Sequence, residues 1–204
     1  MTIITTDAEL DEIYGAPVQR SVTKELDHIS EHYSAYIEAA PFAVIASAGE
    51  AGLDCTPRGD PAGFVAVIDR TTLHLPDRRG NNRIDTLRNL VRDPRVSLLF
   101  LIPGIDVTMR VNGRAAISVD PDLCARYVLQ GKAPRTVIIV TVESAYFQCP
   151  KALVRAKLWS PDHHVDRASL PTTGQMLAAV ERDGAFDGAA YDENYPARME
   201  RTIY

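Results

Sequence analysis

The spacing of apolar residues changes from helical to strand-like at Pro41. Before that point the sequence predicts a short helix over residues 7–14, capped by Thr6 or Asp7. A second helix is predicted over residues 23–40, because apolar residues recur every three or four positions there. Two helices therefore precede the main body of the protein.

The central part of the chain consists of short β-rich runs separated by turn residues. Strands are predicted over residues 42–48, 53–57, 64–68, 72–75, 95–102, 107–118 and 136–149. The first four form two successive hairpins, and Gly113 predicts a bulge or bend in the strand that contains it. Further helices are predicted directly after Arg83 and over residues 120–129, 151–159 and 174–182.

Six or seven strands joined mainly by short turns predict an antiparallel sheet that is too large to stay open. The connections that contain helices are too few for an alternating parallel fold. The predicted fold is therefore mainly β with flanking helices, in the form of a small antiparallel β-barrel.

Charge and cysteine content limit the classes of partner. The net charge is −5, so no global basic surface attracts nucleic acid or an anionic membrane, and we expect neither as a partner. Cys55, Cys124 and Cys149 lie far apart without a C-x-x-C pair, which is typical of a reducing compartment. The start of the chain, MTIITTDAELDEIYG, is acidic and lacks the apolar core of a signal peptide. We expect a cytoplasmic protein.

One loop stands out as a candidate anion site. Within residues 73–89 a short strand ends at Pro76, and an amphipathic helix follows the polar loop. Side chains that bind anions surround Gly80 in this loop, namely Arg78, Arg79, Asn81, Asn82 and Arg83. This pattern predicts a site for a phosphorylated small molecule. The alternative, given equal weight from the loop alone, is a solvated loop in which Asn82 merely caps the helix.

Five segments in order resemble the pyridoxamine 5'-phosphate oxidase-like flavoproteins. They are TPRGDPAGFV (56–65), LHLPDRRGNNRIDTLRNL (73–90), DPRVSLLFLIPG (93–104), MRVNGRA (109–115) and YFQCPKALVRAKLW (146–159). The resemblance is to an uncharacterised bacterial branch of this family. It implies an FMN-binding split β-barrel, a homodimer, and FMN in a cleft between the subunits.

The resemblance also implies which residues hold the cofactor. Contacts to the FMN phosphate are implied for Arg78, Asn81, Asn82 and Arg83, with Arg79 as a substitute. Contacts near the flavin ring are implied for Thr56, Pro57 and Arg58. The last strand–helix corner reaches the partner subunit's flavin in such proteins, which implies Lys151, Arg155 and Trp159.

The implied activity is an FMN-dependent oxidoreductase that transfers a hydride through flavin N5 to or from a small-molecule substrate. The substrate is not indicated, because the vitamin B6 enzyme's tyrosine-threonine-asparagine and serine-arginine-lysine strings are replaced here by Leu75-Pro76-Asp77 and Gly80-Asn81-Asn82-Arg83. No catalytic side chain is predicted. Two alternatives stay open: a flavin-binding or storage module without turnover, and a barrel that binds another phosphorylated cofactor.

The resemblance divides the chain into two parts. Residues 1–160 form the expected FMN-binding barrel domain with its N-terminal helices, and residues 161–204 a C-terminal extension packed on the barrel or on the partner subunit. The string HISEH (28–32) matches an inverted zinc-protease motif, but Ile29 and Tyr33 indicate an ordinary amphipathic helix. We therefore expect no metal site.

Overall fold

The computed structural model describes residues 1–50, 52–182 and 184–204 of the chain. Its centre is a seven-stranded sheet in the order β2-β1-β5-β6-β7-β4-β3, in which every neighbouring pair is antiparallel. The strands are β1 (Phe42–Gly49), β2 (Gly52–Gly59), β3 (Ala66–Asp69), β4 (Thr72–Asp77), β5 (Arg95–Ile102), β6 (Ile105–Ser118) and β7 (Thr136–Gln148). The two hairpins and the later strands are confirmed.

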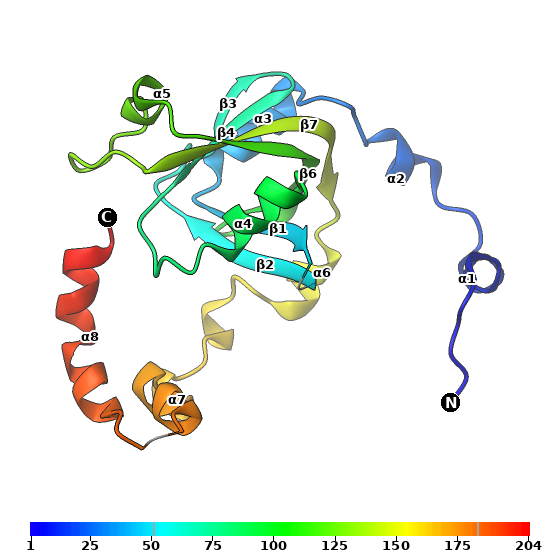
Figure 1. Ribbon diagram of the computed structural model, residues 1–204. Coiled ribbons are helices and arrows are strands. Elements are labelled where there is room, and N and C mark those ends of the chain that lie inside the picture. The colour runs from blue at the N-terminus through cyan, green and yellow to red at the C-terminus, as the bar shows by residue number, and fades with distance from the viewer. Residues whose placement is uncertain (51, 183) are drawn as a thin grey trace.

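Alternation along the strands places the core on one face of the sheet. In β1 the side chains of Ala43, Ile45 and Ser47 are buried and their neighbours are more exposed. They lie opposite Phe100, Leu98 and Val96 of β5, so the apolar sets of both strands face the same interior. The sheet curls around this core (Figure 1).

The barrel is split rather than closed. In the described residues the edge strands β2 and β3 each pair with one neighbour only. The register shifts between Asn112 and Gly113 where β6 meets β7, so the predicted bulge is confirmed. The antiparallel split β-barrel with flanking helices is thus the fold of this chain.

Two helices cover the sheet. Helix α3 (Glu31–Ala39) packs against β3, β5, β6 and β7, and α4 (Asp85–Arg92) packs against β1, β2 and β6. Ile37 of α3 and Leu90 of α4 are buried in the core. The shorter helices are α5 (Pro121–Ala125) and α6 (Lys151–Ala156), with one-turn 3₁₀ helices at Pro161–His163 and Arg167–Ser169.

Two extensions leave the barrel in different directions (Figure 1). The N-terminal one carries α1 (Asp7–Tyr14), with the expected Thr6 cap, and α2 (Gln19–Thr23). The C-terminal one carries α7 (Thr173–Val180) and α8 (Gly188–Thr202), which pack against each other. The end of α8 then returns to the barrel, where the Tyr204 hydroxyl donates a hydrogen bond to the Asp60 carboxylate (2.8 Å).

The prediction of one helix over residues 23–40 is wrong. The backbone of Leu26 pairs with that of Ala145 in β7, and the Ile29 amide donates to the Arg70 carbonyl (2.7 Å). Helix α3 therefore begins only after Ser30, whose hydroxyl accepts from the Tyr33 amide. Pairing with the sheet satisfies the same backbone groups that a continuous helix would have used, so tertiary contacts override the local periodicity.

Two further elements differ from the sequence predictions. The helix expected over residues 120–129 is limited to α5, although its Asp120 cap and early Pro121 are confirmed. The 15-residue helix α8 was not predicted, since its apolar content is low and Pro196 lies inside it. The expected turn after β1 includes Ala51, which lies outside the described residues.

Candidate functional site

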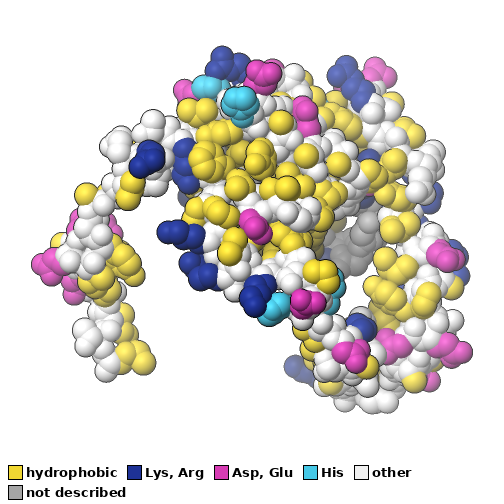
Figure 2. All heavy atoms as spheres, turned by 180° about the vertical axis from the view of Figure 1, so that it is seen from behind, with side chains coloured by type: hydrophobic (Ala, Val, Ile, Leu, Met, Phe, Trp, Pro, Cys, Tyr) yellow, Lys and Arg dark blue, Asp and Glu magenta, His cyan; other side chains and the backbone are white. Residues whose placement is uncertain are grey.

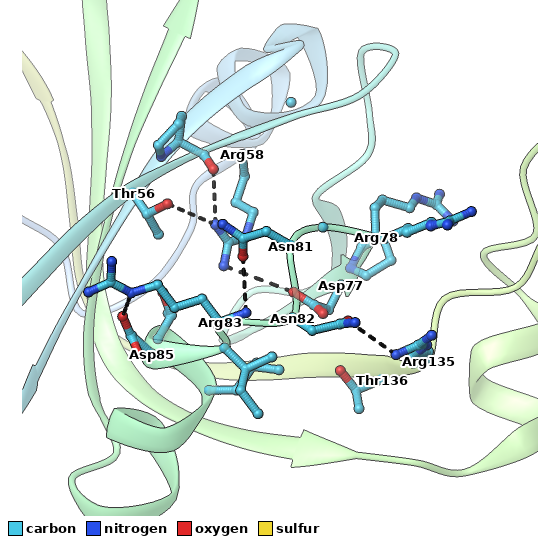
Figure 3. Close-up of a pocket in the computed structure, with 18 of the residues that line it drawn as sticks. Thr56, Arg58, Asp77, Arg78, Asn81, Asn82, Arg83, Asp85, Arg135 and Thr136 are labelled. Carbon is cyan, nitrogen blue, oxygen red and sulfur yellow. Dashed lines mark hydrogen bonds and ion pairs between the residues drawn. The ribbon is translucent and has the colours of Figure 1, made fainter. Parts of the chain in front are cut away.

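A cavity of about 980 Å³ opens beside the loop that joins β4 to α4. Its walls come from β2, from the end of β4 and the following loop, from the first turn of α4, from the start of β7, and from Ile203 and Tyr204. Figure 3 shows the side chains of the β4–α4 loop gathered around this space. Segments distant in the sequence thus build one site.

The backbone of the loop is held in an unusual conformation. Asn82 has φ 60° and Ile84 has φ 52°, both in the left-handed region. For Ile84, a β-branched residue, this conformation is costly and needs support from the surrounding structure. The Asn81 side chain gives part of that support by accepting a hydrogen bond from the Arg83 amide (3.0 Å). Ile84 lies at the N-cap position of α4 and makes no side-chain cap, so the interpretation of Asn82 as the helix cap is wrong.

Arg58 lies on the inner wall of the cavity, where it approaches the Asp77 carboxylate of β4 (3.9 Å). The Arg58 guanidinium also donates to the Pro57 carbonyl (2.9 Å) and the Thr56 hydroxyl (3.3 Å). Burial raises the pKa of the Asp77 carboxyl, and the charges of Arg58 and Arg135 partly offset this effect. The positive charge of Arg58 thus favours the ionised form of Asp77, against the effect of burial.

Arg78 forms a second charged cluster. Its guanidinium pairs with Asp60 (2.7 Å) and donates to the Tyr127 carbonyl (2.6 Å). Asp60 also accepts from the Tyr204 hydroxyl, and this hydrogen bond is the main reason that the pKa of Tyr204 is raised. Asp60 thus pairs with Arg78, which is 18 residues away, and not with its near neighbour Arg58.

The other cations lie nearer to the solvent. Arg83 pairs with Asp85 in the first turn of α4, and its side chain is 79% exposed. Arg135, just before β7, donates to the Asn82 side chain (3.3 Å). An exposed ion pair such as Arg83–Asp85 contributes only about 0–1 kcal/mol, so exchanging the carboxylate for a phosphate would cost little.

The Thr136 hydroxyl is the orphaned group of the site. Its oxygen is buried and makes no hydrogen bond within the described residues, and Thr136 lines the cavity. A buried hydroxyl without a partner is unfavourable by about 1–3 kcal/mol, and a ligand in the cavity would supply one. The volume, the cluster of cations and this unpaired hydroxyl all fit a flavin mononucleotide.

A model of the family described as pyridoxamine 5'-phosphate oxidase matches residues 29–149, more than half of the chain. The chain belongs to the pyridoxamine 5'-phosphate oxidase family. The match covers β1 to β7 and includes the cavity-forming loop. Proteins of this family generally bind a flavin and share an oxidoreductase-like fold.

Solved structures give more distant likenesses. A pyridoxamine 5'-phosphate oxidase-like protein from Lactobacillus delbrueckii is 17% identical, with a TM-score of 0.49, over 60% of this chain and 98% of that one. HupZ from Group A Streptococcus is 18% identical, with a TM-score of 0.47, over 58% of this chain and 93% of that one. No curated protein sequence matches the chain. The family assignment therefore rests on the family model.

Eight of the sequence-predicted site residues line the same cavity: Thr56, Pro57, Arg58, Arg78, Arg79, Asn81, Asn82 and Arg83. Lys151, Arg155 and Trp159 lie elsewhere. The first two belong to α6, and the Trp159 indole donates to the Ile105 carbonyl (3.0 Å). Their predicted contact with a partner subunit's flavin stays a prediction.

Sequence reasoning missed Arg135, Thr136 and Tyr204, which also line the cavity. Arg135 and Thr136 follow from strand pairing, because Thr136 is opposite Asp77 in the β4–β7 register; no local motif marks them.

His28 of the HISEH string precedes α3, whereas His32 lies within it, and no group of three metal-ligating side chains occurs among the described residues. Every helix in residues 1–50, 52–182 and 184–204 is too short or too polar to cross a bilayer.

Proposed function

We propose that this protein binds FMN in the cavity beside the β4–α4 loop and acts as an FMN-dependent oxidoreductase on a small molecule. The observation that carries the proposal is the convergence of Arg58, Arg83 and the unpaired Thr136 hydroxyl on one cavity of about 980 Å³. This volume suits one nucleotide-sized ligand. The family's general flavin binding supports the same cofactor.

In this proposal the loop residues Asn81, Asn82 and Arg83 hold the phosphate. They precede the first turn of α4, where unpaired backbone amides favour an anion. The Arg83 guanidinium matches the oxygen spacing of a phosphate and forms stronger hydrogen bonds with it than neutral donors do. The left-handed backbone at Asn82 and Ile84 keeps this loop in its bound shape before the ligand arrives.

The inner wall would orient the ring system. Arg58 is mostly buried and fixed by Thr56, Pro57 and Asp77, so its charge stays in place. A fixed cation beside the ring stabilises negative charge without reorganisation. Bound there, the flavin supplies the hydride and electron transfer, and the protein supplies binding, orientation and electrostatics.

We also propose a homodimer in which Lys151, Arg155 and Trp159 of each copy approach the other copy's cavity. Proteins of this family are often dimers. Figure 2 shows hydrophobic side chains gathered over one face of the barrel between the two extensions. Exposed apolar side chains on the strands, such as Phe42, Ile105 and Phe147, fit such an interface.

The test is a comparison of FMN with riboflavin, which lacks the phosphate. The purified protein is titrated with each flavin, and binding is followed by quenching of the flavin fluorescence. We expect FMN to bind much more tightly than riboflavin, and the loaded protein to oxidise NADH or NADPH. Equal affinities would show that the loop residues do not bind the FMN phosphate. Tight FMN binding without turnover of any reductant would indicate a storage module.

A further inference from the structure

The segment from α8 to Tyr204 is fastened to the barrel by contacts at one end. Helix α8 packs against α7, and none of its residues, all of which the structure describes, is buried. Figure 1 shows α8 standing apart from the sheet. A segment without buried residues gains little from packing, so the contacts at the Tyr204 end decide whether it stays in place.

Two hydrogen bonds of Tyr204 form this attachment. Its hydroxyl donates to the Asp60 carboxylate (2.8 Å), and its main-chain oxygen accepts from the Lys132 amino group (2.6 Å). Asp60 directly follows β2, whereas Lys132 lies in the connection between α5 and β7. The two bonds therefore join the segment to two separate parts of the barrel.

The attached end is also a wall of the cavity beside the β4–α4 loop. Ile203 and Tyr204 line this cavity, and its other lining residues belong to the barrel. The hydrophobic core of the described residues takes no side chain from the segment 188–204. This part of the wall can therefore move without disturbing the core.

The attachment is suited to opening and closing. A hydrogen bond contributes only modestly to stability in water, and segments held by few contacts open without unfolding of the whole protein. The Asp60 side chain is only 1% exposed, and it also pairs with Arg78 (2.7 Å). When Tyr204 leaves, the buried carboxylate thus keeps its cation, and opening creates no unpaired buried charge.

We propose that α8 and Tyr204 form a latch over this cavity, and that a ligand enters or leaves after Tyr204 has released Asp60 and Lys132. The inference rests on the proposed function for the identity of the ligand, FMN. The latch itself belongs to the ligand-free chain. Because the same bonds form before and after binding, the latch sets the rates of exchange and leaves the affinity nearly unchanged.

The experiment compares the wild type with Tyr204→Phe, which removes one hydroxyl, and with Tyr204→Ala, which removes the whole side chain. Tyr195→Phe is the matched control, because it removes a hydroxyl from an exposed tyrosine of α8 that makes no hydrogen bond within the described residues. Stopped-flow flavin fluorescence measures the association and dissociation rate constants of FMN. Circular dichroism checks that each variant is folded.

We expect Tyr204→Phe to raise both rate constants by at least about three-fold, the effect of losing one hydrogen bond, with the dissociation constant within about two-fold of the wild type. Tyr204→Ala should raise both further, and Tyr195→Phe should change neither. Unchanged rates in both Tyr204 variants would overturn the latch. Faster dissociation alone would also overturn it, because Tyr204 would then hold the ligand directly.

A measurement without FMN separates this inference from the proposed function. Hydrogen exchange of the ligand-free protein reports how often the segment 196–204 opens. Faster exchange there in Tyr204→Phe than in Tyr195→Phe, with the barrel unchanged, would support the latch even if the protein did not bind FMN. Equal exchange in the two variants would overturn the latch even if FMN bound tightly.

Discussion

Single residues in the site differ in how firmly they are held. Arg58 is fixed by three partners and mostly buried, whereas the Arg83 side chain is exposed and within the described residues pairs with Asp85 alone. A buried arginine sets the electrostatic potential of the cavity even without a ligand. An exposed arginine can exchange a carboxylate for a phosphate at little cost, which suits a group that must bind and release.

The first prediction concerns Arg83. The variant Arg83→Ala should bind FMN more weakly by about 1.5–3 kcal/mol, the range for a hydrogen bond to a charged group. Riboflavin affinity should not change, because riboflavin has no phosphate for Arg83 to hold. Fluorescence titration of both flavins measures this difference, with Arg20→Ala as the control. An unchanged FMN dissociation constant would show that Arg83 does not bind the phosphate.

At the scale of elements, the site depends on strand pairing. The β4–β7 register places Thr136 and Arg135 beside the β4–α4 loop. The bulge at Gly113 lies in β6, where β6 and β7 approach so closely that a Cβ atom would lie 2.0 Å from the Thr141 carbonyl oxygen. A side chain there must displace the backbone of the strand that carries Thr136.

Gly113→Ala should therefore destabilise the fold by about 1–3 kcal/mol, the usual cost of overpacking. Gly80→Ala is the matched control, because a Cβ atom at Gly80 meets nothing within 4 Å, and its unfolding free energy should change by less than about 0.5 kcal/mol. Urea denaturation measures both values. Equal effects in the two variants would contradict the close approach of β6 and β7.

A third prediction follows from His74 in β4. Its side chain is buried and bonds through Nδ1 to the Tyr127 hydroxyl (2.8 Å). Burial, together with the charge of Arg126, lowers the pKa of His74 below its ordinary 6.5. At pH values between 6.5 and the lowered pKa, His74 takes up a proton in the unfolded chain but not in the folded chain. The stability of the fold therefore decreases as the pH falls through this range.

The unfolding free energy should thus decrease from roughly pH 7.5 to roughly pH 5, by at most about 1.4 kcal/mol per pH unit for this group. In His74→Gln, which keeps a polar group but does not titrate, the decrease should be smaller. Urea unfolding of both proteins at the two pH values measures the difference. The same pH dependence in both proteins would exclude His74 as its source.

At the scale of the whole molecule, the two extensions have different relations to the barrel. The C-terminal extension returns to the cavity beside the β4–α4 loop through Tyr204. The N-terminal helix α1 has no buried residue, and Ile13 and Tyr14 are exposed. An eight-residue helix is marginal on its own in water, so in the proposed dimer the second copy would give α1 a surface to pack against.

Deleting residues 1–17 should therefore weaken the dimer while the barrel keeps its fold. Sedimentation velocity over a range of protein concentrations measures the mass, and circular dichroism the fold. We expect a dimer for the full chain and a larger monomer fraction for the shortened one. A monomeric full-length protein would contradict the homodimer, and an equally stable shortened dimer would place α1 outside the interface.

The amino-acid sequence by itself determined the strands, their hairpins, the bulge at Gly113 and the position of the cationic loop after β4. These features depend on local patterns: alternation of apolar residues, turn residues between strands, and clustered cations around one glycine. The family resemblance then predicted that Thr56–Arg58 would join Arg78–Arg83, and the structure places both segments on one cavity.

Only the tertiary structure decided the break before α3, the pairing of Asp60 with Arg78, and the presence of Arg135, Thr136 and Tyr204 in the site. Each depends on groups far apart in the chain, brought together by sheet register or by the returning α8 segment. Backbone groups at Leu26 and Ile29 could satisfy their hydrogen bonds either in a helix or on the sheet. Packing of the whole barrel decides between the helix and the sheet, and no short stretch of sequence predicts the outcome.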